Sequence, residues 1–219
     1  MLATTGNLQI YNTPNASTVI TNQTGNSIGF ADSIVTDNMP GAVAIVPATG
    51  AYHPPIGYYV PGGTYAIRMN NFSASSTYFT AFGDSVTYGY NREAATPAQT
   101  DNLHLANGLS ITNRDNIVKR LDLRTIVSVD TVERTFDLLN VNSFSGDSLR
   151  MKEIGQTDLL MANFGRGKSY DLRLTFGATR RNGRFAHTEV PLDSNSSHRI
   201  IPQWNDLATQ PVKILIALG

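Results

Sequence analysis

Alternation between apolar and polar residues is the clearest pattern along this chain. Residues 170–176, YDLRLTF, alternate strictly, and residues 65–69 and 121–124 follow the same rule. Successive side chains of a β-strand point to opposite faces, so a period of two places the apolar set on one face. We therefore predict that these segments are strands whose apolar face is buried in a core and whose polar face is exposed.

Two other apolar segments show little alternation. They are residues 43–46, VAIV, and residues 212–218, VKILIAL. Strands of continuous apolar character are typical of sheets that are covered on both faces. We therefore predict both segments as core strands.

Helical periodicity is weak throughout. No window of ten or more residues free of Pro and Gly has the i, i+3, i+4, i+7 apolar spacing of an amphipathic helix. The best short candidate covers residues 205–210 and is stopped by Pro211. Many short strands without helices predict an all-β protein: one or more antiparallel β-sandwiches, jelly-roll or immunoglobulin-like, with almost no helix.

The strongest turn signal is Asn182-Gly183. A type I′ turn needs positive φ at both central positions, which these two residue types tolerate best, so we predict a hairpin with this pair at its tip. Arginines at such a tip suit phosphate, sulfate or uronate ligands. Alternatively, they are solvated charges that keep a strand edge from aggregating. These candidate binding residues are Arg180, Arg181 and Arg184.

Charged residues are unevenly distributed. Of the 17 Lys and Arg and the 17 Asp and Glu, residues 1–91 contain only Arg68 and three aspartates. The change coincides with a stretch of linker-like composition. We predict an N-terminal β lobe at 1–91, a linker or crossing loop at 92–106, and a C-terminal β-sandwich lobe at 107–219. A single sandwich whose long loop crosses there is the alternative.

Composition narrows the possible partners and the compartment. A formal net charge of zero provides no long-range field for nucleic acid, and no apolar run approaches the ~18 residues of a membrane span. We therefore expect no nucleic-acid partner and no membrane insertion. The Asn/Ser/Thr-rich, cysteine-free chain favours an extracellular or cell-surface location. Its first residues lack a secretion signal, so we expect any leader to have been removed.

One motif points to chemistry. Residues 82–89, FGDSVTYG, resemble the first sequence block of the SGNH (GDSL-type) hydrolases. The resemblance implies ester hydrolysis with Ser85 as nucleophile. In the late pair, His198 would act as general base and Asp193 would orient it. That family is α/β and opens with this block, whereas here no helix follows it. Gly-Asp-Ser also recurs at residues 146–148, so we interpret both copies as turns and keep the hydrolase as an alternative.

Tyrosines flank Pro- and Gly-rich turns in the predicted first lobe. Exposed tyrosines would form a stacking platform for sugar rings or a contact surface for a protein. The alternative is that they pack at the margin of the core. The four histidines lack metal-ligand spacing, so no metal or cofactor is expected. The candidate tyrosines are Tyr52, Tyr58, Tyr59 and Tyr65.

Several short segments carry a second resemblance. Residues 6–11, 39–42, 60–67 and 197–207 are similar to accessory β-sandwich modules of secreted bacterial and archaeal surface proteins and hydrolases. The resemblance implies a noncatalytic role in adhesion, surface display or packing between copies. We therefore expect a structural or adhesive protein that contacts copies of itself or other surface proteins. The alternatives are a carbohydrate-binding module with glycan partners, a single-jelly-roll viral or shell protein, and the Ser85 hydrolase.

Overall fold

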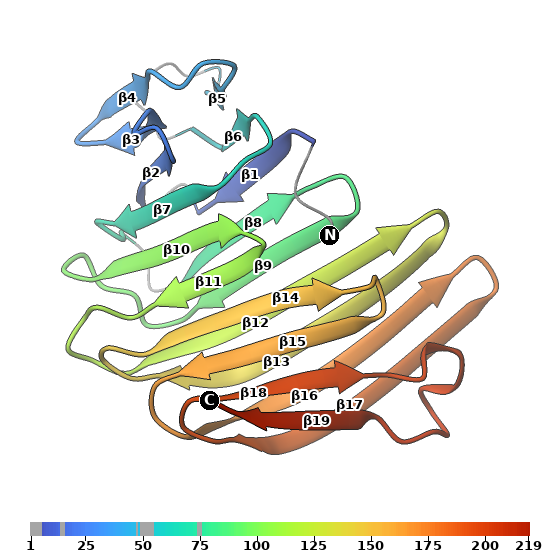
Figure 1. Cartoon of the computed structure of the whole chain (residues 1–219). Coiled ribbons are helices and arrows are strands. Elements are labelled where there is room, and N and C mark those ends of the chain that lie inside the picture. Colours follow the sequence, from blue (N-terminus) through green and yellow to red (C-terminus); the bar gives the residue numbers. More distant parts are fainter. Residues whose placement is uncertain (1–5, 14–15, 47, 49–54, 74–75) are drawn as a thin grey trace.

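The computed structural model describes residues 6–13, 16–46, 48, 55–73 and 76–219. In these ranges nearly all regular structure is antiparallel β-strand, arranged in two large sheets that pack face to face (Figure 1). Strands with one apolar face bury that face against another layer, which produces a sandwich. The prediction of an all-β sandwich is confirmed.

The smaller sheet has nine strands and the larger has ten. In spatial order, the nine-stranded sheet consists of β17 (Arg181–Leu192), β16 (Lys168–Ala178), β13 (Val132–Ser143), β12 (Lys119–Val129), β9 (Val86–Arg92), β8 (Thr77–Phe82), β1 (Leu8–Asn12), β6 (Gly57–Val60) and β5 (Val43–Ile45). The ten-stranded sheet consists of β19 (Lys213–Leu218), β18 (Ser196–Ile201), β15 (Asp158–Phe164), β14 (Ser148–Ile154), β11 (Gly108–Thr112), β10 (Thr100–Ala106), β7 (Tyr65–Asn70), β2 (Ser17–Asn22), β3 (Ser27–Ala31) and β4 (Ile34–Asp37). A short 3-10 helix, η1 (Trp204–Asp206), precedes β19. Among the described residues, no helix has the length and apolar character to cross a membrane.

From β8 onward, hairpins alternate between the two sheets. The hairpins β8–β9, β12–β13 and β16–β17 extend the nine-stranded sheet, while β10–β11, β14–β15 and β18–β19 extend the ten-stranded sheet. Each hairpin pairs with the preceding hairpin of its own sheet, so the sandwich grows from an N-terminal end to a C-terminal end (Figure 1). The strand order therefore gives one continuous sandwich built from successive hairpins.

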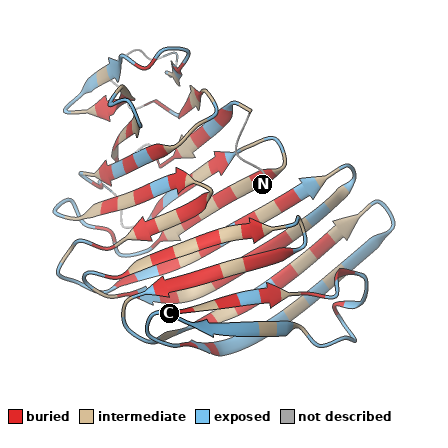
Figure 2. Cartoon of the chain, viewed as in Figure 1, coloured by how far each residue is buried: buried red, intermediate tan, exposed pale blue. Residues whose placement is uncertain are grey.

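The core lies between the facing sides of the sheets, and buried positions alternate along the strands (Figure 2). The alternation predicted for residues 170–176 is confirmed in β16, where the apolar side chains are buried and the polar ones are not. It is confirmed equally in β7 and in the first half of β12. One continuous set of buried residues runs from Leu8 to Leu207.

Both apolar segments that we predicted as core strands are edge strands, so these two predictions are wrong. β5 ends the nine-stranded sheet and β19 ends the ten-stranded sheet. The side chains of Val43, Ile216 and Leu218 are 57%, 58% and 76% exposed. A run of apolar residues shows which side chains are present, but the fold decides whether a second layer covers them.

The hairpin predicted around Asn182-Gly183 is present between β16 and β17, but its turn lies elsewhere. Thr179 and Arg180 occupy the turn, and Asn182-Gly183 lies within β17. This register places Phe185 against the core. Packing of the strand against the sandwich therefore overrides the local turn preference of Asn-Gly.

The segment 92–106, predicted as a linker or crossing loop, connects the two sheets. Residues 93–99 cross from β9 to β10, and the next seven residues form β10 itself. Buried ion pairs hold this crossing: Asp101 lies 3.0 Å from Arg92 Nε and 2.9 Å from Lys119 Nζ. The crossing is thus anchored in the core. The division of the chain into two lobes here stays a prediction.

Candidate functional site

The strand β19 presents an apolar surface at the C-terminal end of the sandwich, which we call the β19 surface. Ile216 and Leu218 pair with His198 and Ser196 of β18, whose side chains are buried on the inner side of the sheet. Directly opposed residues of an antiparallel pair share a face, so these two side chains also point inward. They are nevertheless largely exposed, at an end of the sandwich where β17 is the last strand of the other sheet. Ile216 and Leu218 therefore form an exposed apolar surface at this end of the sandwich.

The backbone of β19 is free on its outer edge. The N–H of Gly219 donates to the C=O of Asn195 at 2.7 Å, which continues the β18–β19 ladder. Hydrogen-bonded and non-hydrogen-bonded pairs alternate along such a ladder, so the odd-numbered residues of β19 bond to β18. The backbone groups of Ile214, Ile216 and Leu218 therefore point to the open edge.

The other edge strands carry features that discourage strand pairing. β17 contains Arg184, Glu189 and Pro191, and Glu189 adopts a φ of 55° at a bulge. β4 ends at Asp37, and β5 has only three residues. Charges, proline, bulges and short strands are the usual means of protecting an edge. In β19 the only charged residue is Lys213.

The residues of the predicted hydrolase site come from both sheets. Ser85 lies in the connection between β8 and β9 of one sheet, whereas His198 lies in β18 of the other. His198 is 1% exposed, and its Nδ1 is 3.0 Å from the hydroxyl oxygen of Tyr170. Burial lowers the pKa of His198, although the negative charge of the exposed Asp193 acts to raise it. Among the described residues, no hydrogen bond joins Ser85 to a histidine.

Two of the candidate tyrosines belong to the core rather than to a stacking platform. Tyr58 in β6 and Tyr65 in β7 are 1% and 3% exposed, and burial raises the pKa of both. Tyr59 is the next residue of β6 and points to the opposite face, where its hydroxyl accepts a hydrogen bond from Asn7 at 2.7 Å. Strand alternation thus separates these rings, and the alternative of packing against the core holds for Tyr58 and Tyr65. Tyr52 lies outside the described residues.

The three candidate arginines do not form one cluster. Arg180 lies in the β16–β17 turn, and the Arg181 guanidinium donates to a backbone carbonyl in η1. Arg184 lies on the outer face of β17, where it lines a hollow with two arginines that sequence reasoning did not select, Arg124 and Arg173. The strand register, rather than the predicted turn, therefore determines which arginines are neighbours.

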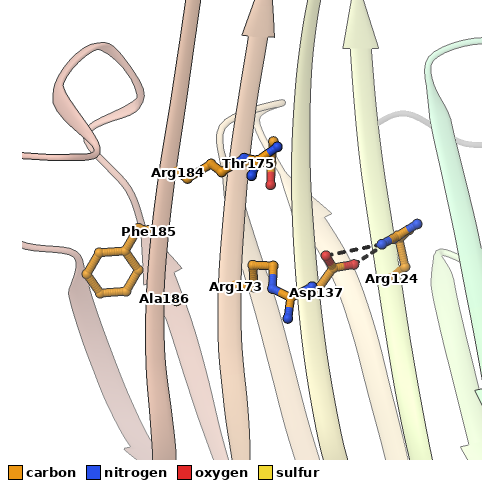
Figure 3. A pocket seen from close by; sticks show the side chains of 7 residues that line it. All are labelled: Arg124, Asp137, Arg173, Thr175, Arg184, Phe185 and Ala186. Atoms are coloured by element: carbon orange, nitrogen blue, oxygen red, sulfur yellow. Dashed lines mark hydrogen bonds and ion pairs between the residues drawn. The ribbon is translucent and has the colours of Figure 1, made fainter.

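This hollow lies on the outer face of the nine-stranded sheet and has a volume of about 540 Å³ (Figure 3). Asp137 is 3% exposed and accepts hydrogen bonds from Arg124 Nε at 2.6 Å and from Arg124 Nη2 at 3.2 Å. Hydrogen bonding to Asp137 raises the pKa of the Arg124 guanidinium. The lining residues are Arg124, Asp137, Arg173, Thr175, Arg184, Phe185 and Ala186.

The second Gly-Asp-Ser copy forms a structural turn, as we interpreted it. Gly146 has a φ of 85°, and the Asp147 carboxylate accepts hydrogen bonds from the backbone N–H groups of Phe144 and Arg166. It also forms a buried ion pair with Lys168. Burial alone would raise the pKa of Asp147, but these hydrogen bonds, led by that from Lys168, lower it. The motif therefore holds a turn.

Comparisons with known proteins add nothing to these observations: no family model, no curated protein and no solved structure matches the chain. Within the described ranges, no three His, Asp or Glu side chains gather where they could hold a metal ion. The fold and its surfaces define an all-β sandwich protein with one unprotected apolar edge and an arginine-lined outer hollow.

Proposed function

We propose that this chain is a noncatalytic structural or adhesive protein of the cell exterior that associates with itself through the β19 surface. The observation that carries the proposal is β19, where free backbone groups and exposed inward-pointing side chains fall on the same residues. A net charge of zero lets like chains approach without repulsion. The cysteine-free, Asn-, Ser- and Thr-rich composition supports the exterior location.

A second copy of the chain fits the β19 surface by symmetry. Two β19 strands that pair antiparallel about a two-fold axis place Ile216 opposite Ile216 of the second copy, and Ile214 opposite Leu218. These residues carry the free N–H and C=O groups, so about six backbone hydrogen bonds would form. Their side chains would gather on one inner side. A slip by one residue would lose this match because it exchanges the faces.

The charges at the two ends of β19 agree with this pairing. Lys213 starts the strand, and Gly219 at its other end is bonded to Asn195, two residues after the exposed Asp193. The two-fold pairing brings Lys213 of each copy toward Asp193 of the other. It keeps the two Lys213 residues about 20 Å apart along the strands. Opposite charges thus approach while like charges are separated.

Cysteine cross-linking tests this register directly, because the chain has no cysteine of its own. Ile216→Cys would place the two thiols at the two-fold axis, where opposed Cα atoms of a hydrogen-bonded pair lie about 5.5 Å apart, within the disulfide range. We expect a covalent dimer after mild oxidation. Ile34→Cys, at a 65% exposed site at the opposite end, is the matched control and should stay monomeric. Equal cross-linking of both variants, or none at position 216, overturns the proposed pairing.

Light scattering tests self-association without a cross-link. The wild-type chain should change from monomer to dimer as its concentration rises, whereas Ile216→Lys should stay monomeric because it places a charge at the centre of the apolar contact. An unchanged far-ultraviolet circular dichroism spectrum would show that the variant is folded. A wild-type chain that is monomeric over the whole accessible concentration range would falsify the proposal.

A further inference from the structure

The outer face of the nine-stranded sheet carries a straight row of residues that crosses six strands. In each adjacent pair of strands, neighbouring members of the row are directly opposed. Since strands lie about 4.8 Å apart, the row is about 24 Å long, which suits an extended chain better than a small molecule. Its members are Thr80 in β8, Gly89 in β9, Arg124 in β12, Asp137 in β13, Arg173 in β16 and Ala186 in β17.

Two hollows follow this row and meet at Arg124 and Asp137. The first is the arginine-lined hollow of Figure 3, and the second, of about 310 Å³, extends toward β8. Gly89 lines the second hollow and, because it has no side chain, leaves the sheet surface open there. Tyr78 stands at the far end of the row and is 45% exposed. We call the two hollows together the outer-face groove.

The outer-face groove has an excess of positive charge. The carboxylate of Asp137 is occupied by two hydrogen bonds from Arg124. Neither Arg173 nor Arg184 forms an ion pair within the part of the chain that the structure describes. In Figure 3 the Arg184 side chain extends toward Thr175 on the neighbouring strand. Two guanidinium groups therefore remain available to a ligand.

We propose that the outer-face groove binds an extended oligosaccharide that carries carboxylate or sulfate groups. Arg173 and Arg184 would bind the acidic groups, since guanidinium matches planar and tetrahedral oxyanions with paired donors. The Tyr78 ring offers an apolar face to a sugar ring, and the hydroxyls of Thr80 and Thr175 can bond sugar hydroxyls. This site lies on the other sheet from β19, so it does not rest on self-association.

A nucleic acid fits this groove less well than an acidic saccharide. The Asp122 carboxylate lines the second hollow, and the chain as a whole has no net charge. A polyphosphate backbone has a negative charge on every nucleotide and depends on a broad positive field. A saccharide with spaced acidic groups meets the arginines at one end and presents neutral rings to Tyr78 at the other.

Titration calorimetry of the full chain tests the groove. The probes are hexagalacturonate, a chondroitin sulfate hexasaccharide, uncharged cellohexaose and hexathymidylate. We expect at least one acidic hexasaccharide to bind at least tenfold more tightly than cellohexaose and hexathymidylate. The double variant Arg173→Gln/Arg184→Gln should bind that saccharide at least tenfold more weakly, because it loses charge-assisted hydrogen bonds. Tyr78→Ala should weaken binding about threefold through the lost ring contact.

The matched control is Arg199→Gln, which removes an arginine on the ten-stranded sheet that is paired with Asp158. Its affinity for the saccharides should equal that of the wild type. Each variant is first compared with the wild type by its urea midpoint, and Arg184→Gln alone replaces the double variant if that variant is unfolded. No binding of either acidic saccharide, or equal binding by the arginine variant, overturns the proposal. Tighter binding of hexathymidylate assigns the groove to polyphosphates and overturns it too.

Discussion

The two ends of the sandwich are closed in different ways. At the N-terminal end, β3 and β4 of one sheet contact β5 of the other, and Ala44 of β5 packs against the core. At the C-terminal end, η1 supplies the seal: Trp204 is 7% exposed and meets Phe136 edge-on at a ring distance of 5.1 Å. Beyond this seal, β19 continues with Ile216 and Leu218 exposed. Among the described residues, Ile34 of β4 and Val43 of β5 are also exposed at the N-terminal end, but β19 has the longer exposed apolar run.

The two ends differ in how the fold treats an apolar edge strand. Residues 43–46 and 212–218 have the same kind of sequence, and both lie at sheet edges. The first is short and contacts β3 and β4 of the other sheet, whereas the second keeps Ile216 and Leu218 exposed. The β19 edge therefore supports the proposed self-association, whereas the short β5 edge does not.

The largest expected effect comes from removing the C-terminal seal. Trp204→Ala should lower the free energy of unfolding by about 3–5 kcal/mol, since it leaves a cavity against Phe136 and removes the hydrogen bond to Thr157. Met39→Ala, at a buried site near the N-terminal end, should cost about 2 kcal/mol. Urea unfolding measures both variants. A smaller loss for Trp204→Ala than for Met39→Ala would contradict the role of Trp204 as a seal.

A somewhat smaller effect is expected from breaking a buried ion pair in the charged part of the chain. Asp147→Asn should lower the free energy of unfolding by about 3 kcal/mol, because the Lys168 charge stays buried without its partner. The pKa of Asp147 is lowered in the folded chain, so its stabilisation is present above about pH 3.9 and is lost as the pH falls through the lowered value. Urea unfolding between pH 7 and pH 2 should show a weaker pH dependence in the variant than in the wild type.

The matched control for this experiment lies in the charge-poor N-terminal region. Asn12 is buried and donates hydrogen bonds to the C=O of Thr13 and the hydroxyl of Thr18, so its interactions involve no ionised group. Asn12→Ala should destabilise the chain by about 1–3 kcal/mol without changing the pH dependence below pH 5. Equal pH profiles for Asp147→Asn and the wild type would show that the ion pair is not responsible for acid sensitivity.

The smallest expected effect concerns His198 near the C-terminal end. Burial lowers its pKa, so the unfolded chain takes up a proton more readily, and stability should fall as the pH drops below about 6.5. His198→Gln should remove this dependence between pH 7.5 and pH 5, as measured by urea unfolding. His104→Gln changes an exposed histidine and should leave the pH dependence of stability as in the wild type.

Much of the fold was predictable from local pattern. The alternation of β16 follows directly from Tyr170, Leu172, Leu174 and Phe176, because a strand exposes its two faces in turn. The turn of the β16–β17 hairpin was not predictable in the same way. Its register depends on how Phe185 packs against the core, which no local preference records.

The candidate sites were less predictable than the strands. Arg184 was selected from the sequence, but its true neighbours Arg124 and Arg173 lie 60 and 11 residues away along the chain. They share a hollow because β12, β13, β16 and β17 are adjacent in one sheet. Tyr58 and Tyr65 were selected for their residue type, yet their positions in β6 and β7 turn them into the core.

The sequence by itself determined the all-β class and the inner and outer faces of the regular strands, because both follow from residue type and a period of two. Only the tertiary structure decided that residues 43–46 and 212–218 form sheet edges and that side chains of β19 are exposed. It also decided which arginines line the hollow on the outer face. These properties depend on strand order and register, and therefore on packing between segments far apart in the chain.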